Sequence, residues 1–164
     1  RALSRACGAP VTVHVLRHEW GRALPDERRR LGPGIPGRLL VREVLLLCAG
    51  RPRVYARSIL PESSLTGPLE RLRGLGSRPL ADVLFTVPDL SRGPLEFAVL
   101  APGEPLHERA REALAHPPAH PPHSPERAAE PGPVTPLWAR RSRFVRGRRP
   151  LLVTEVFPPQ DRPP

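Results

Sequence analysis

Two charged residues interrupt stretches of the chain that are otherwise mostly aliphatic. Arg42 lies in the run from Leu39 to Cys48, and Glu155 lies in the run from Leu151 to Phe157. Successive side chains of a β-strand point to opposite faces. Arg42 and Glu155 therefore each share a strand face with apolar side chains. These neighbours are Leu40, Val44, Leu46 and Cys48 for Arg42, and Leu151, Val153 and Phe157 for Glu155. Because an unpaired buried charge is costly, both residues need a partner.

Two interpretations differ in what that partner is. In the first, Arg42 and Glu155 pair with each other, or lie at the surface with only their stems packed. In the second, both line a ligand pocket, and the guanidinium fork of Arg42 binds the carboxylate of an organic acid. Opposite charges about 4 Å apart gain roughly 4 kcal/mol at an effective dielectric of 20. Glu155, whose apolar neighbours favour the protonated form, then handles a proton or hydrogen-bonds a substrate hydroxyl.

The elements that must position these residues are mainly strands. Apolar and polar residues alternate from Val11 to Arg17, and the runs Leu39 to Cys48 and Arg53 to Leu60 predict an antiparallel hairpin. Three further strands are predicted, at Leu95 to Leu100, Trp138 to Arg146 and Leu151 to Phe157. The pattern predicts an α+β fold in one domain, with about six mostly antiparallel strands.

The connections between the strands differ in character. Residues 64–86 predict a helical hairpin over the sheet, because leucine recurs at helical spacing in 69–75 and Pro79 to Phe85 is typical of a second short helix. Asp26 to Arg30 is polar and precedes a Gly- and Pro-rich stretch, which predicts a plain connection.

Residues 101–136 form a Pro- and His-rich insertion. A short helical stretch from Leu106 to Leu114 precedes eight prolines, so we expect most of the segment to be mobile at the surface. His116, His120 and His123 have the side chains for a metal site, but the prolines among them favour a solvated low-complexity tract. We expect no metal and no cofactor.

The net charge of +10 raises the question of nucleic-acid binding. All 26 basic residues are arginine, and the densest cluster lies between Arg140 and Arg149. Arg140 and Arg141 face opposite ways on a strand, and aromatic residues make up only 4% of the chain, so a solvated hairpin is favoured over a nucleic-acid surface. We expect no nucleic-acid partner.

The cysteines, the apolar runs and the chain length indicate where the protein is located and how much of it the sequence covers. Cys7 and Cys48 make no disulfide framework or metal motif and are predicted to be reduced thiols. No apolar run reaches the roughly 18 residues of a membrane helix, and the start has no signal-peptide pattern, so we expect a cytoplasmic protein. The 164 residues predict a single domain, and the lack of any Met predicts that a preceding N-terminal segment is missing.

Six motifs in the same order along the chain resemble the chorismate pyruvate-lyase family. The resemblance extends from about Leu3 to Phe157, apart from the insertion, and its motifs are Val41-Arg42-Glu43-Val44-Leu45-Leu46, Arg57-Ser58-Ile59-Leu60-Pro61, Leu65-Thr66-Gly67-Pro68, Arg78-Pro79-Leu80 with Leu84-Phe85, Trp138-Ala139-Arg140-Arg141-Ser142, and Pro150-Leu151-Leu152-Val153-Thr154-Glu155-Val156-Phe157. It implies an antiparallel six-stranded sheet with helical flaps enclosing the ligand. It also implies cofactor-independent conversion of chorismate to 4-hydroxybenzoate and pyruvate, the entry step of ubiquinone synthesis.

The resemblance also implies roles for three residues. Arg42 matches the arginine that binds the ring carboxylate, Leu80 matches a residue whose backbone amide contacts that carboxylate, and Glu155 matches the carboxyl near the ring hydroxyl. A further contact lies ahead of the position that matches Arg1. The chain departs from the family pattern at Ala49 and Ala81, where Asp and Gly occur, and in its longer insertion.

Two other functions are alternatives to the lyase. Effector-binding domains of some bacterial transcription regulators share this architecture, so a non-catalytic small-molecule sensor is the first. A basic RNA-binding module is the second, and its affinity would fall steeply with salt. We expect a monomer, because a small enclosed pocket needs no partner chain.

Overall fold

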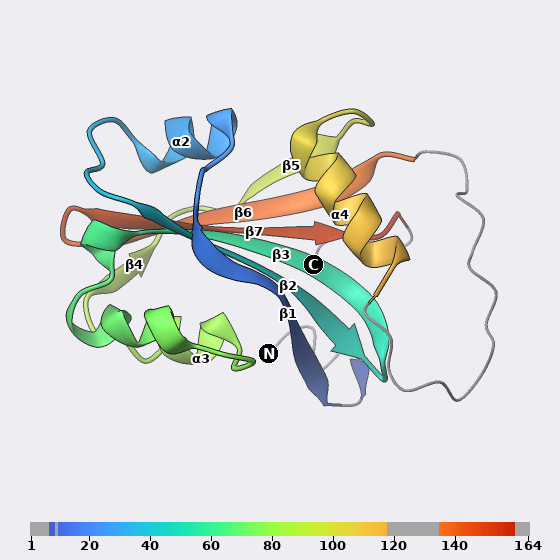
Figure 1. Cartoon of the computed structure of the whole chain (residues 1–164), viewed down its shortest axis with the longest axis horizontal. Coiled ribbons are helices and arrows are strands. Elements are labelled where there is room, and N and C mark those ends of the chain that lie inside the picture. Colours follow the sequence, from blue (N-terminus) through green and yellow to red (C-terminus); the bar gives the residue numbers. More distant parts are fainter. Residues whose placement is uncertain (1–6, 9, 118–134, 160–164) are drawn as a thin grey trace.

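A single antiparallel sheet with helices on both faces makes up the computed structural model, which describes residues 7–8, 10–117 and 135–159 (Figure 1). Its strands run in the order β1-β2-β3-β7-β6-β4, and β5 also pairs with β6. Every pair is antiparallel. The strands are β1 (Val11–Gly21), β2 (Leu39–Cys48), β3 (Arg51–Pro61), β4 (Leu90–Arg92), β5 (Glu96–Leu100), β6 (Leu137–Arg146) and β7 (Arg149–Phe157).

The predicted α+β class and antiparallel pairing are confirmed, with seven strands where about six were expected. The additional strand is β4, whose three residues pair with the C-terminal end of β6. Three residues carry too little alternation to be recognised from sequence, and only the pairing defines this strand.

The face of the sheet that carries Arg42, here called the front face, is covered by residues 62–87. The segment contains the 3-10 helices η1 (Glu62–Ser64) and η2 (Gly67–Gly74) and the helix α3 (Leu80–Leu84). Its leucines pack with Leu40, Leu60 and Leu151 of the sheet. The predicted helical hairpin is therefore present, but its first arm is a 3-10 helix, because leucine at every third position matches the period of three of that helix.

The opposite face, here called the rear face, carries α2 (Pro25–Leu31) and α4 (Pro105–Ala115). The prediction of a plain connection at Asp26 to Arg30 is wrong. Pro25 occupies the first turn of α2, and the Glu27 carboxylate accepts a hydrogen bond from the Leu24 amide at 2.7 Å, which caps the helix start.

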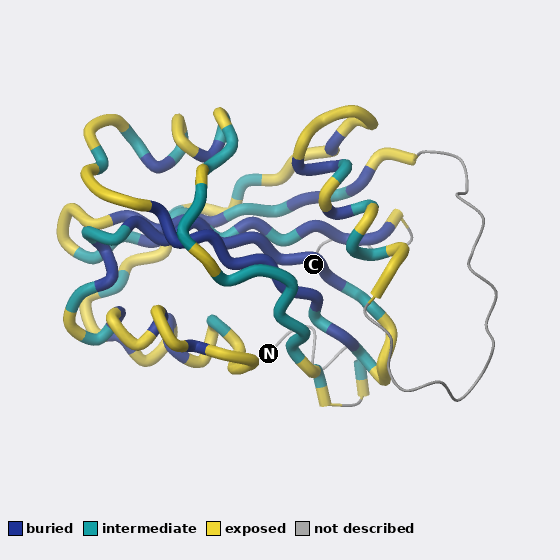
Figure 2. Tube along the Cα trace, viewed as in Figure 1, coloured by how far each residue is buried: buried dark blue, intermediate teal, exposed yellow. Residues whose placement is uncertain are grey.

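The short helical stretch predicted at Leu106 to Leu114, in the first part of the insertion, is confirmed as α4. Helix α4 packs on the rear face through buried Leu106, His107 and Ala110, so residues 105–115 belong to the folded domain. Residues 118–134, where most of the prolines lie, are outside the described part of the chain. Figure 2 shows the buried residues following the middle strands, with exposed positions on the outer sides of the helices.

The prediction of two reduced thiols is wrong, because Cys7 and Cys48 form a disulfide with their Cα atoms 5.9 Å apart. The register explains the contact. Val11 at the start of β1 lies opposite Cys48 at the end of β2, which brings Cys7, four residues ahead of Val11, within reach of Cys48. Sequence spacing gave no sign of this proximity, which depends on strand pairing.

A buried ion cluster joins the rear helices to the sheet. Arg57 on β3 is 1% exposed, and its guanidinium donates to Glu27 of α2 at 2.8 Å and to Glu43 of β2. Arg109 of α4 lies 3.8 Å from Glu43. Burial raises the pKa of the neighbouring Tyr55 hydroxyl, and the charge of Glu43 adds to the effect. Two carboxylates thus depend on Arg57 for compensation.

Replacing Arg57 by Met should therefore destabilise the fold by about 3–5 kcal/mol, because buried Glu27 and Glu43 lose their main counter-charge. The measurement is chemical unfolding followed by circular dichroism. Arg38→Met is the matched control, since Arg38 pairs with Glu62 at an exposed position and its loss should change stability little. Equal effects of the two substitutions would contradict the assigned role of the cluster.

Candidate functional site

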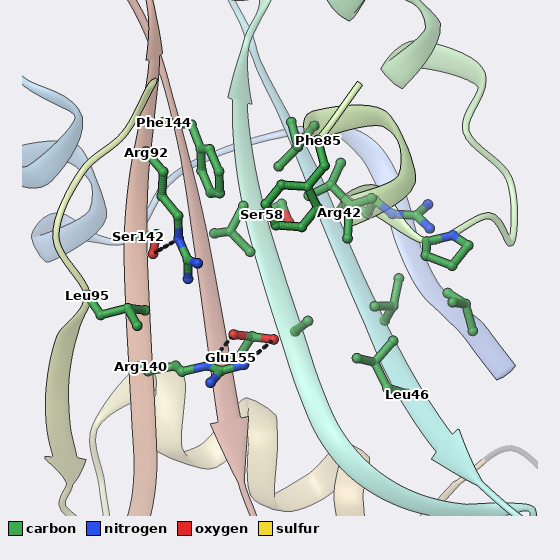
Figure 3. A pocket seen from close by; sticks show the side chains of 18 residues that line it. Arg42, Leu46, Ser58, Phe85, Arg92, Leu95, Arg140, Ser142, Phe144 and Glu155 are labelled. Atoms are coloured by element: carbon green, nitrogen blue, oxygen red, sulfur yellow. Dashed lines mark hydrogen bonds and ion pairs between the residues drawn. The ribbon is translucent and has the colours of Figure 1, made fainter. Parts of the chain in front are cut away.

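The front face contains a pocket of about 560 Å³, a size suited to a small organic ligand. Its floor is built from adjacent strands. Arg42 on β2 lies opposite Ser58 on β3, which lies opposite Val153 on β7, which lies opposite Ser142 on β6. Side chains of α3 and of the segment after β4 form the walls, and Phe85 and Leu95 at the rim are exposed. Arg42 and Glu155 both line this pocket, as strand alternation predicted (Figure 3).

Arg42 is 2% exposed and, within the described residues, forms no ion pair. One terminal nitrogen lies 3.0 Å from Nδ1 of His18, and the other donates to the carbonyl of Arg78 at 3.2 Å. Burial lowers the pKa of Arg42, but an arginine keeps its charge at neutral pH. The pocket therefore contains a fixed positive charge, and the groups that hold it in the described structure, an imidazole and a carbonyl, are neutral.

His18 reaches Arg42 because of a bulge in β1. Val15 lies opposite Val44, whereas Arg17 lies opposite Glu43, so one extra residue shifts the alternation and turns His18 to the front face. To accept from Arg42, Nδ1 must be unprotonated, which makes His18 neutral. Burial, and then the charge of Arg42, lower the pKa of His18, while the backbone of Arg73 acts weakly in the opposite direction.

Glu155 pairs with Arg140 and not with Arg42. The Arg140 guanidinium donates to the two carboxylate oxygens at 2.5 Å and 3.3 Å and lies over the Phe157 ring. The direct Arg42–Glu155 pair, one of the two sequence interpretations, is thus absent from the structure. The surroundings of Glu155 are therefore less apolar than expected, since a guanidinium from the neighbouring strand lies beside its carboxylate.

Leu80, the third expected site residue, also lines the pocket. It is the first residue of α3, where a backbone amide has no partner within the helix. The predicted hairpin is present as β6–β7, and Arg140 and Arg141 face opposite ways as expected, but both are paired with carboxylates rather than solvated. Arg140 points to the front, whereas Arg141 points to the rear and pairs with Asp26 at 3.0 Å and Glu96 at 2.9 Å.

Sequence reasoning missed several residues of the pocket, chiefly Arg92, Arg140 and Ser142. The same alternation that selected Glu155 would place Arg140 and Ser142 on one face of their strand. For Arg92 no such signal existed, because β4 was not recognised. The predicted histidine tract is largely outside the described chain, and no cluster of three metal-type side chains occurs among the residues that are described.

Together these features define a class, a small antiparallel α+β domain with a positively charged pocket of small-molecule size. Residues 1–161 match the family model described as chorismate lyase. A probable chorismate pyruvate-lyase of Halorhodospira halophila is 45% identical over 92% of this chain and 72% of the relative. One of Methylococcus capsulatus is 38% identical over 97% of this chain and 87% of the relative. The chain belongs to the chorismate lyase family.

Solved structures with the same fold come from transcription regulators. The C-terminal domain of the histidine utilization repressor of Pseudomonas syringae has a TM-score of 0.57 at 16% identity and matches 94% of this chain and 96% of its own. The effector domain of PhnF from Mycobacterium smegmatis has a TM-score of 0.57 at 13% identity, over 99% of this chain and 89% of its own. At these identities the likeness concerns the fold alone. Among the described residues, no helix has the length and apolar character to cross a membrane.

The His18–Arg42 contact predicts a pH-dependent stability. Because the pKa of His18 is lowered in the folded state, the unfolded chain binds its proton at higher pH. Stability should therefore fall as the pH drops below the unfolded value of about 6.5 towards the lowered folded value. Thermal unfolding of wild type and His18→Gln between pH 8 and pH 5 measures this.

Wild type should lose more stability over that range than His18→Gln. The exposed His116, replaced in the same way, is the control and should leave the pH profile as in wild type. Identical profiles for His18→Gln and wild type would show that His18 is not the responsible group.

Proposed function

We propose that this protein is a chorismate pyruvate-lyase, which converts chorismate to 4-hydroxybenzoate and pyruvate. The observation that carries the proposal is a pocket, in a chain of this family, with a buried Arg42 that forms no ion pair among the residues the structure describes. The names of the relatives support the same activity. We further propose that the reaction is the entry step of ubiquinone synthesis. The protein would carry it out in the cytoplasm, as a monomer with a single domain.

In this proposal Arg42 binds the ring carboxylate of chorismate. Its guanidinium is held from behind by His18 and the Arg78 carbonyl, so binding requires little reorganisation of the arginine. Desolvation strengthens the attraction, because water is excluded from a side chain that is 2% exposed. The backbone amide of Leu80 is the proposed second donor to the same carboxylate, since it lies at the start of α3 on the pocket wall.

Glu155 is the proposed catalytic residue and lies near the ring hydroxyl in this assignment. Arg140 fixes the orientation of the Glu155 carboxylate through two hydrogen bonds, which holds its oxygens in place to accept a hydrogen bond from the substrate. Ala56, opposite Glu155 on β3, has only a methyl side chain and leaves space above the strand for a ring.

The chemistry needs few groups. Chorismate loses the hydrogen at C4 and the enolpyruvyl ether at C3, the C3–O bond breaks, and the released enolpyruvate gains a proton to become pyruvate. Formation of the aromatic ring drives the reaction, so the protein mainly holds the reactive conformer and stabilises developing charge. No step in this scheme calls for a cofactor.

A non-catalytic effector domain is the second candidate, favoured by the regulator domains that share the fold. It predicts binding of a small anion without turnover. RNA binding is less well supported, because several arginines that raised the possibility are paired with carboxylates, as Arg57, Arg140 and Arg141 are.

Incubating the purified protein with chorismate should yield 4-hydroxybenzoate and pyruvate in equal amounts, measured by absorbance and mass spectrometry. Addition of a chelator should leave the rate unchanged. Binding of chorismate without product would favour the effector domain, and neither binding nor product would reject both candidates.

The site assignment predicts that Arg42→Met and Glu155→Gln act differently. Arg42→Met should weaken chorismate and 4-hydroxybenzoate binding about a hundredfold, since a charged hydrogen-bonded contact contributes about 3 kcal/mol. Glu155→Gln should mainly lower kcat. Steady-state kinetics and calorimetry measure both effects, and Arg148→Met at an exposed turn is the control. Wild-type behaviour of both site variants would reject the assignment.

The route of the C4 hydrogen can be followed with chorismate deuterated at C4. Transfer within the substrate leaves deuterium in the pyruvate methyl group, whereas transfer through Glu155 allows exchange with water.

A further inference from the structure

We propose that Arg92 binds the second carboxylate of the substrate, the one carried by the enolpyruvyl side chain. This assignment rests on the proposed function, because it takes the substrate to be a ring compound with two carboxylates. Arg92 ends β4, the short strand that sequence patterns did not reveal.

The charges that line the pocket favour a ligand with two negative charges. The lining residues include three arginines, Arg42, Arg92 and Arg140, and one carboxylate, Glu155. Arg140 and Glu155 neutralise each other. Arg42 and Arg92 remain, and neither forms an ion pair within the described residues. The pocket therefore has two positive charges in excess, which match a dianion.

Arg92 is held so that its terminal nitrogens are available. Its Nε donates to the buried Ser142 hydroxyl at 2.9 Å, and its guanidinium lies 5.7 Å from the Phe144 ring centre. The amide of the next residue, Gly93, donates to the Arg143 carbonyl at 2.8 Å and fixes the backbone. The two terminal nitrogens have no hydrogen-bond partner in the described chain. A guanidinium fixed at Nε with both Nη atoms open can bind a carboxylate through two parallel bonds.

Arg42 and Arg92 lie on opposite sides of the pocket, with Ser58 between them and the Arg140–Glu155 pair next to Arg92 (Figure 3). Ser142, the partner of Arg92, lies on β6, and Arg42 lies on β2 in the same cross-strand row. The two strands are three strand spacings apart, which is about 14 Å at 4.8 Å each. This separation of the strands, with the two guanidinium groups on opposite sides of the pocket, favours a ring with carboxylates on two substituents over a single carboxylate.

The assignment has a consequence for product release. Once the C3–O bond breaks, the group bound by Arg92 leaves with pyruvate, and 4-hydroxybenzoate keeps only its contacts near Arg42 and Glu155. Arg92 is exposed and lies next to the exposed Leu95, so pyruvate has the nearer path to solvent.

The test compares Arg92→Met with Arg92→Lys and with the exposed control Arg148→Met. Arg92→Met should raise KM for chorismate at least tenfold and leave the Kd of 4-hydroxybenzoate within twofold of wild type. Arg92→Lys retains the charge but not the forked guanidinium, so its KM for chorismate should lie between those of wild type and Arg92→Met. An unchanged KM in Arg92→Met, or an equal loss of 4-hydroxybenzoate affinity, would overturn the proposal.

A binding experiment separates failure of this proposal from failure of the proposed function. 3-(Carboxymethoxy)benzoate has a ring carboxylate and an ether-linked carboxylate, whereas 3-methoxybenzoate has only the first. Calorimetry on wild type should show at least a tenfold preference for the diacid, and Arg92→Met should abolish it. The result does not depend on turnover, and a preference that persists in Arg92→Met, or is absent from wild type, would overturn the role of Arg92.

Discussion

A buried guanidinium with no carboxylate partner in the described chain is the feature on which the arrangement of the front face depends. Arg42 and Arg57 sit on adjacent strands and point to opposite sides of the sheet. Arg57 is compensated by Glu27 and Glu43, whereas Arg42 is held by an imidazole and a carbonyl. On the rear face, the charge of Arg57 therefore stabilises the packing of α2 against the sheet. On the front face the charge of Arg42 has no carboxylate partner in the described part of the chain, which has an energetic cost, and in the proposed function a ligand supplies that partner.

The sheet explains how such a site stays open without collapsing. Strands β2, β3, β7 and β6 fix the Cα positions of the pocket floor through their ladders, and the rear helices cover the other side. The front segment 62–87, which supplies the α3 wall of the pocket, is anchored to the sheet by its leucines and by the Ser64 hydroxyl, which donates to the Pro150 carbonyl at 2.7 Å. The regulator domains share this fold, so the side chains on the pocket floor of this chain, and not the fold, decide its chemistry.

Sequence reasoning succeeded where one period governed a long run. The bounds of β2 and the shared face of Arg42 and Glu155 followed from alternation in aliphatic strands. It failed where a feature was short or depended on another element. Helix α2 has a polar surface with few apolar residues, and the Cys7–Cys48 bond depends on the register of β1 against β2.

The sequence by itself determined the antiparallel α+β fold, the charged residues on apolar strand faces and the family motifs, because each is encoded in local order and spacing. Only the tertiary structure decided their partners. It set Arg140 beside Glu155, brought His18 to Arg42 through a one-residue bulge, and placed Arg92 across the pocket. The physical reason is that alternation specifies which face a side chain occupies, whereas register and bulges specify which side chain lies next to it.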